Sequence, residues 1–183
     1  EPALKPAALS SQTHHVGVMG TRGTVSSARF ARLLSEHSQK TTFAVQACDG
    51  LARAIELATE QPPAADMQGS DLWERCARHT QALGSFGRKT GEIDTLVLGC
   101  THYLFVKDEL RALLGPDVQL IDTGAPVARQ VRRLLAQAGM LAPESRSAPR
   151  IELFATGGLS SLEAAAGRWL DLPAGHCAHI EIA

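Results

Sequence analysis

The sequence predicts an α/β protein built on a mainly parallel sheet with helices packed against it. Short apolar runs of strand length alternate with stretches of helical periodicity along the chain, which is typical of this class. The 183 residues are 44% hydrophobic and 20% charged, as in an ordinary folded chain. Reactive polar residues follow three of the apolar runs, where parallel α/β sheets place their ligand sites.

Two strand and helix units are expected in the first part of the chain. Apolar runs predict strands at His15–Gly20 and Phe43–Cys48. Apolar side chains at helical spacing predict helices at Ser27–His37 and Leu51–Thr59. The segment Gln61-Pro62-Pro63 is expected to end the second helix, because proline cannot continue it.

The middle of the chain predicts a longer helix and then the clearest strand. Asp71 is a good N-cap for a helix over Leu72–Phe86, and its apolar stripe makes Cys76 a core residue. The strand is Asp94–Cys100. A helix around Lys107–Leu114 follows, and Gly115-Pro116 is expected to stop it.

The last third predicts a strand at Val118–Ile121 and a helix at Pro126–Ala138. The side of this helix expected to be buried carries four aliphatic residues: Val127, Val131, Leu134 and Leu135. Met140–Pro149 is predicted to be a loop or linker, because it is rich in Pro, Ser and Ala. After it the pattern predicts three more elements: a strand at Ile151–Thr156, a helix at Ser161–Leu170 and a strand at Ala178–Ile182.

Charge and composition exclude several kinds of protein. The formal net charge of −1 gives no basic excess for binding a nucleic acid. No apolar stretch is long enough to span a membrane, and the first residues do not form a signal peptide, so a cytoplasmic protein is expected. The four cysteines are scattered, without a CxxC pair for zinc, and are expected to be reduced thiols.

Three strand ends carry groups that could take part in chemistry: Thr21-Arg22-Gly23-Thr24, Cys48-Asp49-Gly50 and Cys100-Thr101-His102. The third places a thiol, a hydroxyl and an imidazole in one bend. A thiolate there could attack a carbonyl as a nucleophile or remove a proton from carbon as a base, and a buried structural cysteine is the alternative. A cysteine hydrolase would also need a histidine base, for which five others remain candidates: His14, His15, His79, His176 and His179.

The segment Leu98–Tyr103 resembles the second catalytic motif of the glutamate racemases, within the aspartate/glutamate racemase superfamily. Further segments resemble the family in the same order along nearly the whole chain: Pro2–Ala7, Val16–Val18 with Thr21, Gly23-Thr24 and Ser26, Ala47-Cys48 with Glu56, Ile121–Gly124, and Phe154–Gly158. Asp49 and Leu104 stand where the family often has proline. The family's preceding half, with the first catalytic cysteine, has no counterpart in these residues.

The resemblance implies cofactor-independent interconversion of L- and D-glutamate, which supplies D-glutamate for peptidoglycan synthesis. It implies that Cys100 is the acid/base on one face of the substrate and that His102 assists it. Glu56 would be a carboxylate near His102, and Thr101, Thr21 and Thr24 would bind the substrate. Cys48 is expected to be structural. No metal, pyridoxal cofactor, nucleic acid or membrane partner is expected.

The resemblance also implies parallel-sheet, three-layer domains of the aspartate/glutamate racemase type. Residues 1–122 would form one complete domain with the second catalytic cysteine, and residues 123–183 would be the C-terminal part of another. We expect this part to have an exposed apolar face that favours a homodimer or oligomer, or insolubility. With one of two thiols, the chain alone is expected to be inactive. The alternatives are an aspartate or hydantoin racemase, and a non-catalytic ligand-binding remnant.

Overall fold

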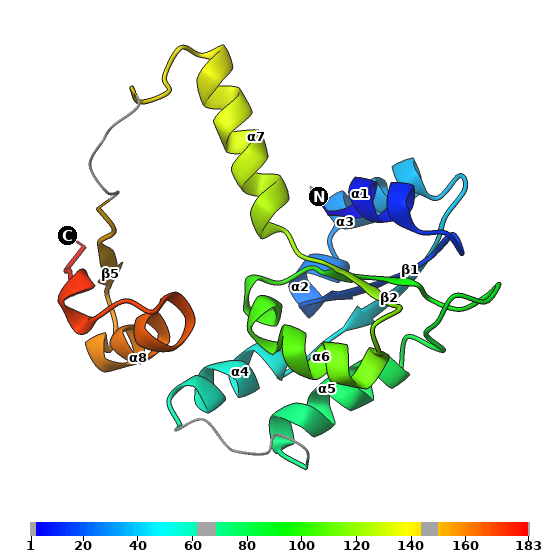
Figure 1. Cartoon of the computed structure of the whole chain (residues 1–183), viewed down its shortest axis with the longest axis horizontal. Helices are drawn as coiled ribbons and strands as arrows, with labels where there is room; N and C mark the ends of the chain where they lie inside the picture. Colours follow the sequence, from blue (N-terminus) through cyan, green and yellow to red (C-terminus); the bar gives the residue numbers. More distant parts are fainter. Residues whose placement is uncertain (1–2, 62–68, 144–149, 183) are drawn as a thin grey trace.

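The computed structural model describes residues 3–61, 69–143 and 150–182. At its centre is a four-stranded parallel sheet, ordered β2-β1-β3-β4. The strands are β1 (His15–Gly20), β2 (Thr42–Ala47), β3 (Thr95–Leu98) and β4 (Gln119–Ile121) (Figure 1). The sheet therefore contains the first four strands that the sequence predicts, and they are parallel, as the alternation of strands and helices indicated.

The two central strands are continuous apolar runs because both faces of the sheet are covered. Val18 of β1 pairs in register with Val45 of β2 and with Val97 of β3. Val18 and Val97 are each 2% exposed, whereas Val45 on the edge strand is 38% exposed. Parallel sheets covered on both sides have such strands, without the alternation of a half-solvated sheet.

Helices form the outer two layers. On one face α1 (Leu4–Ser10) and α3 (Ala28–His37) pack against apolar residues of β1 and β3. On the other face lie α4 (Leu51–Thr59), α5 (Asp71–Gln81) and α6 (Lys107–Leu114). The predicted α/β class and its three-layer form are thus confirmed.

Several predicted boundaries are correct, and one helix was predicted too long. The bounds of α4 and α6 are as expected, and Gly115, with φ of +79°, ends α6. In α5 the N-cap is Ser70, whose Oγ accepts the Trp73 amide at 3.1 Å, and Asp71 is the first helical residue. The helix stops at Gln81 because Gly84 adopts a φ of +125° that a helix cannot contain. Pro62, Pro63 and residues 144–149 of the predicted linker lie outside the described residues.

The C-terminal segment follows β4. It contains α7 (Gly124–Gln137), β5 (Leu153–Ala155), α8 (Leu159–Leu170), the short 3-10 helix η2 (Ala174–His176) and β6 (Cys177–His179). β5 and β6 pair with each other in parallel and do not join the four-stranded sheet. Figure 1 shows α7 extending away from the sheet, with β5 and α8 on the side of α4.

The predicted burial of α7 is wrong. None of its residues is buried, and Val127, Val131 and Leu134 are 44%, 48% and 50% exposed. The apolar stripe has the expected helical spacing, but Val127 and Val131 line an open groove that α1 and α3 border, and they are not packed into a core. The outcome matches the separate expectation of an exposed apolar face after residue 122.

Candidate active site

The carboxyl ends of β1, β2 and β3 meet at one edge of the sheet, because the three strands are parallel neighbours. Thr21 follows β1, Cys48 follows β2, and Cys100 follows β3 after one glycine. The sheet order therefore gathers all three polar strand ends that the sequence singled out. Ligands of open α/β sheets bind at such an edge.

A close backbone approach sets the position of Cys100. The Gly99 amide donates to the Met19 carbonyl at 2.8 Å, and a Cβ at Gly99 would lie 2.7 Å from that oxygen. A side chain does not fit there, which explains the glycine at the strand tip. Cys100 then precedes the 3-10 helix η1 (Thr101–Val106), and its carbonyl accepts the Tyr103 amide at 3.1 Å.

Cys100, His102 and Glu56 form a chain of polar contacts. Nδ1 of His102 lies 3.7 Å from Sγ of Cys100, and Nε2 of the same ring lies 3.1 Å from Oε1 of Glu56. Arg53 holds the other carboxylate oxygen of Glu56 at 3.3 Å. In the tautomer that donates its Nε2–H to Glu56, the ring presents an unprotonated Nδ1 to the thiol. The arrangement can therefore exchange a proton between sulfur and nitrogen.

The predicted substrate-binding threonines lie at the ends of the two central strands. The hydroxyls of Thr21 and Thr24 are 2.9 Å apart, and Thr21 caps the short helix α2 (Arg22–Val25) by accepting the Thr24 amide at 3.4 Å. Thr101 is exposed at the first position of η1, directly after Cys100. These hydroxyls border the edge of the sheet where the thiol is found.

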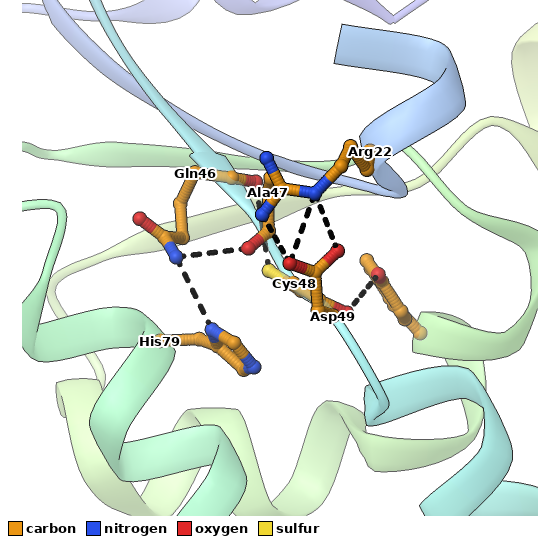
Figure 2. A network of polar contacts seen from close by, with 7 residues as sticks. Arg22, Gln46, Ala47, Cys48, Asp49 and His79 are labelled. Atoms are coloured by element: carbon orange, nitrogen blue, oxygen red, sulfur yellow. Dashed lines mark hydrogen bonds and ion pairs between the residues drawn. The ribbon is translucent and has the colours of Figure 1, made fainter. Parts of the chain in front are cut away.

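A second polar network lies at the end of β2 (Figure 2). Arg22 and Asp49 form an ion pair in which the guanidinium Nε is 3.2 Å and 3.1 Å from the two carboxylate oxygens. The hydrogen bonds from Arg22 lower the pKa of Asp49. Both side chains are more than half exposed, so the pair contributes little to stability. It ties the loop after β1 to the loop after β2.

In the same network the Cys48 thiol is buried. It is 2% exposed, and burial raises its pKa to about 12, so it is not ionised at neutral pH. The Tyr103 hydroxyl donates to the Cys48 carbonyl at 3.4 Å. The Gln46 amide donates to the Ala47 carbonyl and contacts Nδ1 of His79 (Figure 2). Cys76 is fully buried in the core as predicted, and burial raises its pKa to about 12.

Among the histidines, His102 is the one that faces Cys100. His79 is buried, desolvation lowers its pKa, and its Nδ1 contacts Gln46 instead. His176 contacts the Ile151 carbonyl, far along the chain in the C-terminal segment. The histidine in contact with Cys100 is therefore its neighbour two residues along the chain. His79 and His176, which were candidates for the base of a cysteine hydrolase, have other partners.

A cavity of about 400 Å³ lies on the Glu56 side of His102. Its walls come from α4, η1, the loop after β5, and α8. Phe105 of η1 and Trp169 of α8 stack within it, with ring centroids 4.6 Å apart. The C-terminal segment thus reaches the residues beside the thiol site.

Three parts of this site were not predicted from the sequence: the contact of Arg53 with Glu56, the Arg22–Asp49 pair, and the packing of α8. The first had a local signal, since Arg53 stands three residues before Glu56 on a predicted helix. The second could have been inferred from charges at two neighbouring strand ends. The third depends on long-range packing and had no local signal.

The described residues contain no cluster of three His, Cys, Asp or Glu side chains suited to hold a metal ion. No described helix is both long enough and apolar enough to cross a bilayer.

Comparison with known families gives a match over most of the chain. Residues 1–131 match the family model described as Asp/Glu/Hydantoin racemase. A glutamate racemase of Herpetosiphon aurantiacus is 41% identical over 145 residues, which are 79% of this chain and 52% of that protein. A glutamate racemase of Pseudomonas paraeruginosa is 43% identical over 155 residues, or 82% of this chain and 52% of that protein.

Solved structures agree with this relationship. A glutamate racemase isoform from Bacillus anthracis superposes with a TM-score of 0.78 at 27% identity, covering 100% of this chain and 62% of that one. Escherichia coli glutamate racemase, in complex with L-glutamate and an activator, gives 0.68 at 25% identity over 90% of this chain and 58% of that one. The chain spans about half the length of the curated relatives it matches.

Proposed function

The chain belongs to the Asp/Glu/Hydantoin racemase family, and we propose that it supplies one half of the proton-transfer site of a glutamate racemase. The observation that carries the proposal is the contact chain from Cys100 through His102 to Glu56 at the carboxyl end of β3. Glutamate is the proposed substrate because the curated relatives are glutamate racemases. The proposed role in the cell is to supply D-glutamate for peptidoglycan synthesis, and the proposed location of the protein is the cytoplasm.

Cys100 is the proposed acid/base on one face of the substrate. As a thiolate it removes the α-proton: the C–H bond breaks, an S–H bond forms, and the electron pair remains on the α-carbon. A second thiol then delivers its proton to the opposite face, which inverts the centre. No cofactor takes part in this scheme.

His102 and Glu56 tune the thiol. Glu56 orients the imidazole so that Nδ1 faces the sulfur, and the ring can then hold the thiol proton between turnovers. The His102 side chain is 35% exposed in the described chain, so a bound substrate that excludes water from it would strengthen its contact with Glu56.

The threonines are the proposed substrate ligands. Thr101, next to Cys100, hydrogen-bonds the α-carboxylate or ammonium region, and the Thr21 and Thr24 hydroxyls hold the side-chain carboxylate. Hydroxyls and free amides at strand ends are suited to bind carboxylates, since they donate hydrogen bonds without bringing a competing base.

The second thiol is proposed to come from a region equivalent to the unmatched half of the relatives. Cys48 and Cys76 are buried, and Cys177 lies in β6 of the C-terminal segment. Residues 1–122 are the proposed domain that carries Cys100, and 123–183 are the proposed C-terminal part of the other domain. The exposed apolar face of α7 supports this division. We propose that this face is buried when the protein forms a homodimer or oligomer.

Deuterium exchange tests the proposal directly. The purified 183-residue chain is incubated with L- or D-glutamate in D2O, and the α-hydrogen is followed by NMR. We expect exchange from one enantiomer without inversion, because one thiol can remove and return a proton only on its own face. Cys100→Ala should abolish the exchange, and Cys177→Ala should leave it unchanged.

Two outcomes would contradict the proposal. Rapid conversion of L- to D-glutamate by this chain would show that it holds both bases. An absence of exchange from both enantiomers would show that Cys100 does not act as a base in it. A parallel assay with L- and D-aspartate tests the choice of substrate, which is contradicted if aspartate exchanges faster.

A further inference from the structure

We propose that α8 is a clamp that positions the Glu56–His102 pair, with Trp169 and Arg168 as its positioning residues. The inference rests on the proposed function, because it concerns the same thiol site. Glu56 stands on α4 and His102 on η1. The two elements are separated by 41 residues of chain, so only the fold brings them together. One face of α8 contacts both of them.

The first half of the clamp is the end of α4. The last carbonyls of a helix have no partner within it. Arg168 donates to the Ala58 carbonyl near the end of α4 at 2.6 Å, and to the Gln61 carbonyl two residues after the helix at 3.1 Å. Ser161 Oγ, from the start of α8, donates to Oε1 of Glu60 at 2.8 Å. α8 therefore fixes the turn that follows Glu56.

Trp169 joins α4 to η1. Its Nε1–H donates to the Thr59 hydroxyl at 3.2 Å, and that hydroxyl donates to the Ile55 carbonyl within α4. Its ring stacks on Phe105, three residues after His102, at 4.6 Å between centroids and 23° between planes. Arg168 lies over the same indole, 4.9 Å from the centroid. A single side chain thus contacts both elements of the pair.

The pair depends on α8 because His102 and Glu56 are joined by a single hydrogen bond. The His102–Glu56 hydrogen bond is 3.1 Å long and both side chains are partly exposed, so neither is held by surrounding core. Arg53 on the same carboxylate offers an alternative partner. A movement of about 1 Å between α4 and η1 would be enough to weaken the bond to His102. The stacked indole opposes that movement.

The test uses the whole chain and two measurements. The first is the NMR signal of the His102 ring nitrogens, assigned by its loss in His102→Asn, which reports the hydrogen bond to Glu56. The second is the alkylation rate of Cys100 at pH 7, because the thiolate is the reactive form. Glu56→Gln gives the reference values for a His102 ring that has lost its carboxylate partner: the ring signal and the Cys100 alkylation rate.

We expect Trp169→Ala to move the ring signal at least halfway to that of Glu56→Gln and to change the alkylation rate about threefold in the same direction. Trp169→Phe, which can retain the stacking, should stay closer to wild type. Arg168→Gln should follow Trp169→Ala with a smaller effect, and Arg168→Lys should restore part of the difference. Trp73→Ala, on α5, is the matched control for loss of an indole.

The clamp is overturned if Trp169→Ala and Arg168→Gln fold, by circular dichroism, yet keep the wild-type ring signal and alkylation rate. Should Trp169→Ala fail to fold, Trp169→Phe and the Arg168 pair decide the question alone. The proposed function fails separately, in the deuterium-exchange assay with Cys100. A chain can therefore show a working clamp without α-proton exchange, or exchange without a clamp.

Discussion

Two amphipathic helices, α3 in the sheet region and α7 in the C-terminal segment, have apolar stripes of similar spacing, but the stripe of α3 is buried and that of α7 is exposed. Phe30 and Leu33 of α3 are each 8% exposed against the sheet. Val127, Val131 and Leu134 of α7 are 44–50% exposed. An apolar stripe shows that a helix has a face to bury, but only the rest of the fold shows where the partner is.

The C-terminal segment is not uniformly detached, however. α7 leaves its face open, whereas α8 contacts α4 and η1 through specific hydrogen bonds and a ring stack. Stability should therefore depend mainly on the sheet region, and the C-terminal segment should influence the site more than the core. Substitutions matched between the two regions test this difference.

The largest effect is expected from opening a cavity in the sheet. Leu96 of β3 is fully buried, and Leu96→Ala should lower the free energy of unfolding by about 3 kcal/mol. Val131→Ala in α7 should change it by less than about 0.5 kcal/mol, since that side chain is half exposed. Urea unfolding followed by circular dichroism measures both. Similar losses in the two variants would mean that α7 is as tightly packed as β3.

A smaller effect is expected from adding a methyl group at a glycine. Gly99→Ala should cost about 2 kcal/mol, because its Cβ would lie 2.7 Å from the Met19 carbonyl and would have to displace β1 from β3. Gly157→Ala, after β5, has no atom within 4 Å of its Cβ and should be nearly neutral. Thermal unfolding compares them. An unchanged melting temperature for Gly99→Ala would refute the argument for close approach at the strand tip.

The smallest of the three effects depends on pH. Asp94 is 6% exposed, and burial alone would raise its pKa, but hydrogen bonds from Ser11, Thr13, Gln12 and Thr95 outweigh this and lower it. A lowered folded-state pKa stabilises the protein above the ordinary value of 3.8, and this stabilisation is lost as pH falls through the folded value. Asp94→Asn should therefore cost about 1–2 kcal/mol at pH 7 and progressively less below pH 3.8.

Urea unfolding of wild type and Asp94→Asn from pH 7 to 2.5 measures how the difference between their free energies of unfolding decreases. Glu152→Gln, beside β5, is the matched control in the C-terminal segment. Its side chain is 49% exposed with Arg150 as partner, so its removal should change little at any pH. A gap for Asp94→Asn that stayed constant with pH would contradict the role assigned to its charge.

Much of the sheet region could be predicted from the sequence because its signals are local. Strand β1 and helices α4 and α6 have the predicted bounds, since apolar runs and a terminal glycine mark them. The overlong prediction for α5 has a local cause as well. Leu83 and Phe86 continue the helical spacing and pack on the core, but they lie in the segment after Gln81, on either side of Gly84.

The site was only partly predictable. Cys100 and His102 are two residues apart, so their contact could be expected from a bend in the chain. Glu56 came from the resemblance to a family, because nothing local links α4 to η1. The contacts of Arg168 and Trp169 join residues more than 60 positions from either element, and only the folded chain shows them.

The order of strands also has a consequence for how the molecule folds. β1 and β2 pair across a connection that contains only α2 and α3, whereas β3 pairs with β1 across a longer stretch that also contains β2, α4 and α5. Pairings between distant residues close large loops and form slowly. The thiol of Cys100 therefore reaches the Thr21 loop only when β3 pairs with β1, and a refolding chain should form its ligand-binding edge later than the local β1–β2 unit.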